Sequence, residues 1–165
     1  MPFKLKSVVA AMLAWALASA ANAQGVVMVR DVSYDLALVM AQTAIEQCRS
    51  RGFKIGVSVV DRGGHVLVTL RDHGAAHHTV ELAQRKAYTS RIFRQTTRAF
   101  SQRLIDNPIS AGLGTTSGVV ASLGGLPIKV GDETIGGIGV SGAPGGQNDE
   151  ACAQAGLDKV ADLLK

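Results

Sequence analysis

The stretch TIGGIGVSGAPGGQNDEACAQAG, residues 134–156, predicts a strand, a glycine-rich turn and a helix in succession. Residues 134–141 alternate β-branched side chains with glycine, which is typical of a strand whose bare side another backbone or a ligand can approach. Gly137 and Gly139 are the candidates for that close approach. Residues 141–146 suit a tight turn, and the polar and acidic residues 148–150 suit the first turn of a helix. The pattern alone leaves open whether the turn contacts a ligand or only connects two elements.

The N-terminal residues predict export. Lys4 and Lys6 precede an apolar run over residues 8–18, and Ala21-Asn22-Ala23 has the small-residue pattern of a cleavage site. We therefore expect residues 1–23 to be a signal peptide and the protein to be periplasmic or secreted. The alternative is a single membrane anchor, but the apolar run is shorter than the roughly 20 residues that span a bilayer. We expect no stable membrane anchor after cleavage.

The composition of the mature chain predicts one domain without a polyanionic partner. The chain has 17 Lys and Arg against 13 Asp and Glu, and removing Lys4 and Lys6 leaves 15 against 13, a net charge of +2. Neither this balance nor any run of basic residues interleaved with aromatics favours nucleic-acid binding. Residues 24–165 are the right length for a single domain with one core.

The remaining periodicities predict an α+β fold. Two pairs of β-rich runs are each joined by a short turn, which is typical of hairpins. Helical patterns precede, separate and follow these pairs, so we expect an antiparallel sheet with helices packed on it. A Gly/Ser/Thr-rich passage over residues 109–125 is either a structured loop over a site or a long connection. The expected helices are 33–51, 78–92, a segment from 96 or 97 to before 107, and 147–164, and the expected strands are 54–61, 65–71, 126–130 and 134–141.

Four motifs follow one another in the chain: residues 61–65 (DRGGH), 86–89 (KAYT), 124–128 (GGLPI) and 136–144 (GGIGVSGAP), followed by the acidic pair 149–150. In this order they resemble the GlcG/HbpS-like family, which includes haem-binding domains attached to corrinoid adenosyltransferases. The resemblance covers residues 33–164 and implies a profilin-like antiparallel sheet of about five strands flanked by helices, assembled as a homo-oligomer. Family members are described as haem binders, haem degraders or proteins of unknown role, so the resemblance supplies no universal catalytic residue.

Three of the four histidines, His73, His77 and His78, lie where the second predicted strand ends and the next helix begins. Loop side chains and free helix N–H groups can converge on an anionic ligand at such a place. The pair His78-Thr79 resembles a pattern of the family's exported members, which favours His78 over His77. Many family members carry an acidic residue at the position of His73, so no acidic role is transferred to this loop.

Haem is the first candidate ligand. In that hypothesis His78 is an axial ligand to the haem iron, and Arg71 or Lys86 pairs with a propionate. Thr79 and Lys86 recur on one helical face, which would line the pocket. The alternative interpretation is that the long side chain of Lys86 covers the sheet edge or lies in a contact between subunits.

Two other hypotheses use the same residues. One is a metal site that combines the histidines with Glu81, although their spacing matches no established ligand pattern. The other is an isomerase-like or hydrolase-like enzyme for a small organic acid or carbonyl compound, with His78 as the acid or base. The histidines could equally be solvent-facing or helix-terminal residues. The sequence contains no G-x-S-x-G elbow, P-loop or dinucleotide fingerprint.

Cys48 and Cys152 are the only cysteines, and export would place them in an oxidising compartment. The profilin-like arrangement implied by the resemblance makes the first and last helices antiparallel, which brings the end of one close to the start of the other. We therefore expect an intrachain disulfide between Cys48 and Cys152. The alternative is two buried free thiols that behave as small hydrophobic residues.

Overall fold

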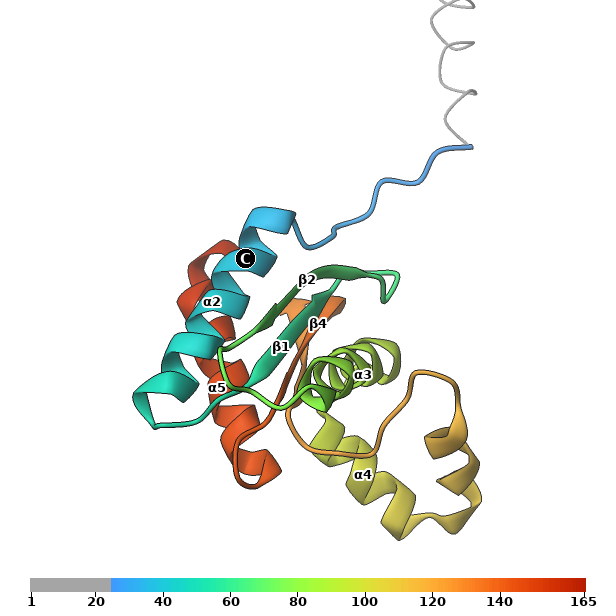
Figure 1. Cartoon of the computed structure of the whole chain (residues 1–165). Coiled ribbons are helices and arrows are strands. Elements are labelled where there is room, and N and C mark those ends of the chain that lie inside the picture. The colour runs from blue at the N-terminus through green and yellow to red at the C-terminus, as the bar shows by residue number, and fades with distance from the viewer. Residues whose placement is uncertain (1–24) are drawn as a thin grey trace, which may run out of the picture.

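The computed structural model describes residues 25–165, which form one α+β domain with helices on both faces of an antiparallel sheet (Figure 1). The predicted signal peptide lies outside the described residues. Within them, no helix is long and apolar enough to span a membrane. The elements are α2 (Tyr34–Ser50), β1 (Gly56–Val60), β2 (Val66–Arg71), α3 (His78–Phe93), α4 (Thr97–Asp106), the 3-10 helix η1 (Pro108–Thr115), β3 (Gly125–Val130), β4 (Glu133–Ser141), α5 (Gly146–Lys159) and the 3-10 helix η2 (Ala161–Leu163).

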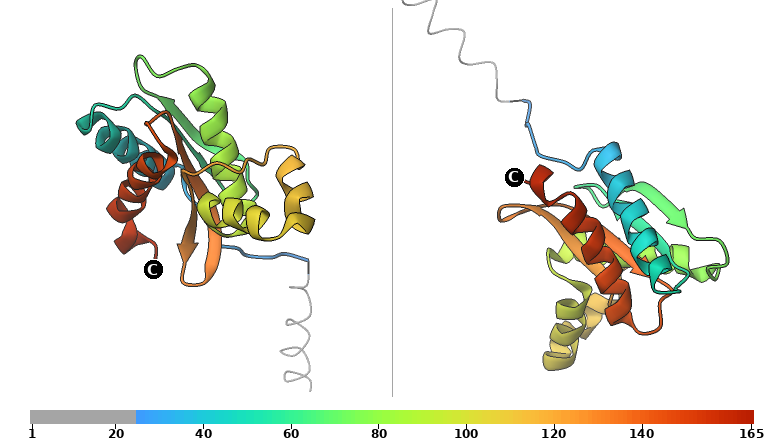
Figure 2. Two further views of the ribbon diagram at one scale, coloured as in Figure 1. Left: turned by 90° about the horizontal axis from the view of Figure 1, so that it is seen from below. Right: turned by 90° about the vertical axis from the view of Figure 1, so that its left-hand side faces the viewer.

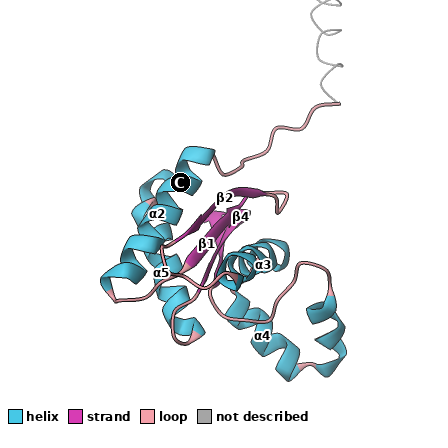
Figure 3. Cartoon of the chain, in the orientation of Figure 1, coloured by secondary structure: helices cyan, strands magenta, loops and turns pink. Residues whose placement is uncertain are grey.

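The sheet has the order β2-β1-β4-β3, and all neighbouring strands are antiparallel. The predicted fold class is confirmed, but the described residues form four strands where the family resemblance implied about five. α2 and α5 cover one face side by side, and α3 covers the other (Figures 2 and 3). The main apolar core lies between the sheet and the α2–α5 layer, where valine, isoleucine and alanine dominate.

Strand β4 is nearly all buried because α3 lies directly on its glycines. A Cβ atom at Gly139 would lie 2.1 Å from the carbonyl oxygen of Ala83, and one at Gly137 would lie 2.3 Å from that of Ala87. The bare side of this strand was therefore predicted correctly, but the backbone that occupies it belongs to α3. Gly137 and Gly139 are not ligand-binding residues, since no ligand or neighbouring subunit can reach them through the helix.

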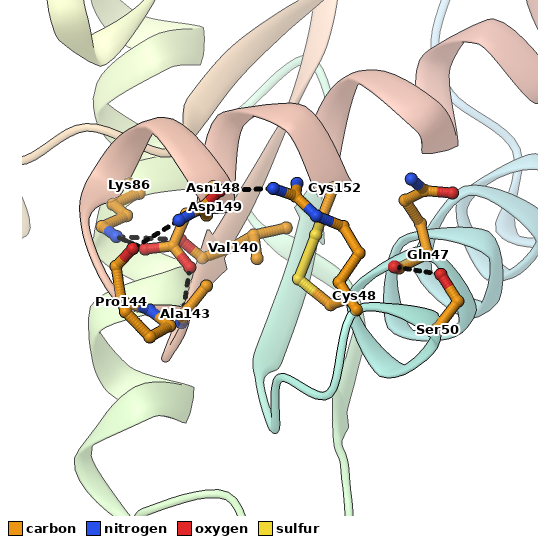
Figure 4. The surroundings of a disulfide bond; sticks show 11 residues. Gln47, Cys48, Ser50, Lys86, Val140, Ala143, Pro144, Asn148, Asp149 and Cys152 are labelled. Carbon is orange, nitrogen blue, oxygen red and sulfur yellow. Dashed lines mark hydrogen bonds and ion pairs between the residues drawn. A yellow bond between two sulfur atoms is a disulfide. The ribbon is translucent and has the colours of Figure 1, made fainter.

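The disulfide expected between Cys48 and Cys152 is present in the structure, with a Cα–Cα distance of 5.5 Å. It joins the C-terminal end of α2 to the first turns of α5, and both residues are fully buried (Figure 4). Arg51 donates a hydrogen bond to Asn148 beside it. The chain-entropy model gives about 4 to 5 kcal/mol, as an upper figure, for closing a loop of this length.

The start of α2 follows from its sequence. Ser33 caps the helix by accepting a hydrogen bond from the backbone N–H of Leu36. Before this cap, Val32 is buried, whereas Val26, Val27 and Met28 are 78%, 82% and 91% exposed. The segment before α2 is therefore an extended apolar arm that the described domain does not cover (Figure 1).

Candidate ligand-binding groove

The loop between β2 and α3 is held in place by a buried carboxylate. Asp72 is 3% exposed and accepts hydrogen bonds from Arg49 at 2.7 and 3.3 Å, with Lys54 at 3.9 Å. The hydrogen bond from Arg49 holds the pKa of Asp72 below its ordinary value, against the effect of burial. Arg71 donates to the carbonyl oxygen of Ala75 at 2.6 Å. These contacts fix the loop that presents the histidines.

The N-terminal end of α3 borders a hollow of about 350 Å³. His77 and His78 are both exposed on its rim, and Arg71 reaches it from the end of β2. Imidazole nitrogens and a guanidinium are therefore presented to one space, as the haem hypothesis requires. The residues that line this hollow are Arg71, His77, His78, Val80, Glu81 and Gln84.

A second hollow of about 480 Å³ continues along the same helix. It shares Glu81 and Gln84 with the first, so we treat the two as one ligand groove along the outer face of α3. Each volume is within the roughly 300–1,000 Å³ that is common for ligand pockets. The residues that line the second hollow are Gly64, Glu81, Gln84, Arg85, Tyr88 and Gly118.

Lys86 is not part of this groove, contrary to the sequence-based prediction. Its side chain is 2% exposed, and Nζ donates to Asp149 Oδ2 and to the carbonyl oxygen of Val140, both at 2.9 Å (Figure 4). Asp149 also accepts a hydrogen bond from the backbone N–H of Ala143. Burial raises the pKa of Asp149, although Lys86 opposes that shift. Lys86 therefore ties α3 to the start of α5 and has no donor that faces a ligand.

Thr79 is also buried rather than ligand-facing, because its hydroxyl donates to the carbonyl oxygen of Ala76 at 2.7 Å. The sequence correctly grouped Thr79 and Lys86 on one helical face, but that face packs against the sheet. The opposite face carries His78, Glu81, Gln84 and Tyr88. Of these, Gln84 and Tyr88 were missed as site residues. Glu81, Gln84 and Tyr88 follow His78 by three, six and ten residues, and this helical spacing was the available signal.

The other histidines are not in the groove. His73 does not line either hollow, and His65 lies in the β1–β2 turn, where it contacts Asp61. Across residues 25–165, no three His, Cys, Asp or Glu side chains come together in a way that could hold a metal ion. The described residues therefore give no support to a metal site built from the histidines and Glu81.

The layers and the groove define an α+β domain of profilin-like architecture with an open site on one helix. The model of the family described as haem degrading protein HbpS-like matches residues 32–158. The crystal structure of HbpS is 34% identical, covers 84% of this chain and 96% of that chain, and superposes with a TM-score of 0.79. The chain belongs to the HbpS-like family.

Two further relatives extend the comparison. The crystal structure of the PduOC:Heme complex is 26% identical, covers 78% of this chain and 94% of that chain, and has a TM-score of 0.69. Protein GlcG of Escherichia coli strain K12 is 28% identical over 111 residues, which is 67% of this chain and 81% of that protein.

Proposed function

We propose that this protein binds haem in the ligand groove, with His78 as an axial ligand to the iron. The observation that carries the proposal is that the exposed imidazole of His78 and the guanidinium of Arg71 border the same hollow. Neutral imidazole is a common haem ligand, and a guanidinium matches a propionate carboxylate. A family described as haem degrading and a relative solved as a heme complex support this assignment.

The residues present fit haem in their chemistry. No hydrogen bond within residues 25–165 occupies the His78 imidazole, so its ring nitrogens are free to coordinate. Arg71 donates a hydrogen bond from Nη1 to the Ala75 carbonyl oxygen, and its other N–H groups can donate to a carboxylate. When bound, the haem would supply the iron for ligation and any redox chemistry. The protein's own residues would orient the macrocycle and neutralise its carboxylates.

The test is a haemin titration of the purified mature protein, followed by the Soret band. We expect a sharp, shifted band for wild type, weaker binding for His78→Ala, and wild-type binding for His65→Ala, the control histidine outside the groove. Identical spectra for wild type and His78→Ala would remove His78 as the ligand. A wild type that does not bind haemin would contradict the proposal and favour the alternative, an isomerase-like or hydrolase-like enzyme for a small organic acid or carbonyl compound.

We further propose that the protein is exported to the periplasm or secreted. The charged and apolar pattern of residues 1–23 and the buried disulfide between Cys48 and Cys152 support this, because disulfides persist in oxidising compartments. Intact-mass measurement of the extracytoplasmic protein should give a chain that starts at Gln24 with two fewer hydrogens than the reduced form. A cytoplasmic, full-length and reduced protein would contradict export.

We also propose a homo-oligomer. The exposed apolar residues Val26, Val27 and Met28 support it, since a contiguous apolar run on a soluble domain commonly marks a contact. Light scattering on the eluting mature protein should give a mass that is a multiple of the single chain. Replacing Val27 with Asp should lower that mass. A monomer at all concentrations for the wild type would contradict the proposal.

A further inference from the structure

Tyr88 lies in the second hollow, where two glycines from distant parts of the chain fix its ring. A Cβ atom at Gly64, in the β1–β2 turn, would lie 3.0 Å from one edge of the ring, and one at Gly118 would lie 3.3 Å from the other edge. Both glycines have positive φ, 85° and 78°, so the backbone also favours glycine there. The ring is therefore held between two backbone segments, and a residue larger than glycine at either position would displace the ring.

The segment at Val119 and Val120, which forms the wall of this hollow, is held against α3 by two hydrogen bonds. Arg85 Nη2 donates to the carbonyl oxygen of Val119 at 2.8 Å, and Thr89 Oγ1 accepts from the backbone N–H of Val120 at 2.9 Å. These two bonds dock the long connection before β3 onto the helix. Tyr88 lies between the two residues that make them. The second hollow is therefore built from three parts of the chain and is not a chance gap between side chains.

The hydroxyl of Tyr88 is left available. The residue is half-buried, no group in residues 25–165 forms a hydrogen bond with its hydroxyl, and the oxygen is not sealed away from solvent. A tyrosine with a buried ring usually places its O–H on a partner. Here the ring is held, the residue lines the hollow, and the hydroxyl has no partner among residues 25–165, which is the arrangement expected of a group that meets a ligand.

We propose that Tyr88 donates a hydrogen bond to a carboxylate oxygen of the bound ligand, at the end of the groove away from His78. This inference rests on the proposed haem function. Ten residues separate His78 from Tyr88, about 15 Å along a helix, so the two contact different parts of an extended ligand. Both haem propionates leave one edge of the macrocycle on flexible chains, so the hydroxyl of Tyr88 has a carboxylate acceptor when that edge points along the groove toward it. Glu81 is 3.8 Å from Arg85, and this pairing offsets its negative charge near the site.

The experiment compares haemin with haem dimethyl ester, whose propionates are neutral, as ligands of wild type, Tyr88→Phe and Tyr34→Phe. Tyr34 is the only other tyrosine and is exposed on α2, so its variant is the matched control. We expect Tyr88→Phe to bind haemin about tenfold more weakly, because a hydrogen bond to a charged group is lost, and to bind the ester with a clearly smaller loss. Its melting temperature should match wild type, since the ring remains.

Three outcomes would overturn the inference. Haemin binding by Tyr88→Phe within twofold of wild type would show that the hydroxyl contributes nothing. Equal losses for haemin and the ester would show that Tyr88 does not act on a propionate. Wild-type protein that fails to bind haemin would instead overturn the proposed function, and this inference with it, so the two failures are told apart by the wild-type titration.

Discussion

The two faces of helix α3 have different roles: the inner face packs on the sheet, and the outer face lines the ligand groove. The inner face packs on β4 so closely that glycines are required beneath it, and its fully buried cation, Lys86, forms an ion pair with Asp149. The outer face carries His78, Glu81 and Tyr88 along an open groove. Residue type alone therefore does not identify a ligand-binding cation. Burial decides whether the charge serves the fold or a ligand.

Arg85 and Lys86 show this most directly, because they are adjacent in the chain. A helix turns by roughly 100° per residue, so neighbouring residues point in different directions. Arg85 faces the groove and holds the wall at Val119, whereas Lys86 faces the sheet and bonds to Val140 and Asp149. Changes on the inner face of α3 should therefore alter stability, and changes on its outer face should alter binding.

The largest effect is expected for Gly139→Val on the sheet beneath α3. The new Cβ would lie 2.1 Å from the Ala83 carbonyl oxygen, and a backbone atom cannot move aside unless the whole helix shifts. We expect a loss of more than about 4 kcal/mol in the free energy of unfolding, well above the roughly 1 kcal/mol of strand propensity. Chemical denaturation measures it. The control is Gly112→Val, where nothing lies within 4 Å of the added atom; equal stability of the two variants would contradict the close packing.

Lys86→Met should follow, because it leaves Asp149 buried without its cation. We expect a loss of about 3–5 kcal/mol at pH 7, against little change for Lys129→Met on the exposed part of β3. Burial raises the pKa of Asp149, so its contribution to stability is fully present below the ordinary value of 3.8 and is lost as pH rises through the raised pKa. The penalty of Lys86→Met should therefore shrink as pH is lowered through that window. A penalty independent of pH would contradict this role of Asp149.

Much of the fold could be predicted from the sequence. Residue patterns located the α-helices and strands but not the two 3-10 helices, and Ser33 marked the start of α2 because its capping side chain precedes a periodic run. The pairing of Cys48 with Cys152 followed from the profilin-like arrangement that the resemblance implies, because it brings together the helix ends that carry them. Local pattern predicted the four strands that the described residues form, whereas the fifth strand was implied only by the family resemblance and is not found among them.

The site could be predicted only in part. His78 and Arg71 were chosen because histidines cluster where a strand gives way to a helix, and the structure places both on the groove. The choice of Thr79 and Lys86 was wrong, because helical spacing shows which residues share a face but not which face meets the sheet. The role of Tyr88 depends on Gly64 and Gly118, which approach it from segments far apart in the sequence.

A small effect on stability is expected for the outer face. His78→Ala and Glu81→Ala remove exposed side chains that make no buried contact, so each should change the free energy of unfolding by less than about 0.5 kcal/mol. Urea denaturation of the unliganded proteins measures this. A loss above about 1 kcal/mol for either variant would show that the outer face also serves the fold and would weaken the division between the faces.

The division of α3 is tested most directly by the stabilisation that haemin confers on an inner-face and an outer-face variant. Ser90→Ala is a mild inner-face change, since the buried hydroxyl donates to the Ala87 carbonyl oxygen at 2.8 Å, and it should lower stability by about 1 kcal/mol. At a haemin concentration 100 times the dissociation constant, wild type should gain about 2.7 kcal/mol. Ser90→Ala should be less stable than wild type without haemin but should gain the same stabilisation from haemin. His78→Ala should have wild-type stability without haemin and should lack most of the stabilisation from haemin. A gain kept by His78→Ala and lost by Ser90→Ala would contradict the account.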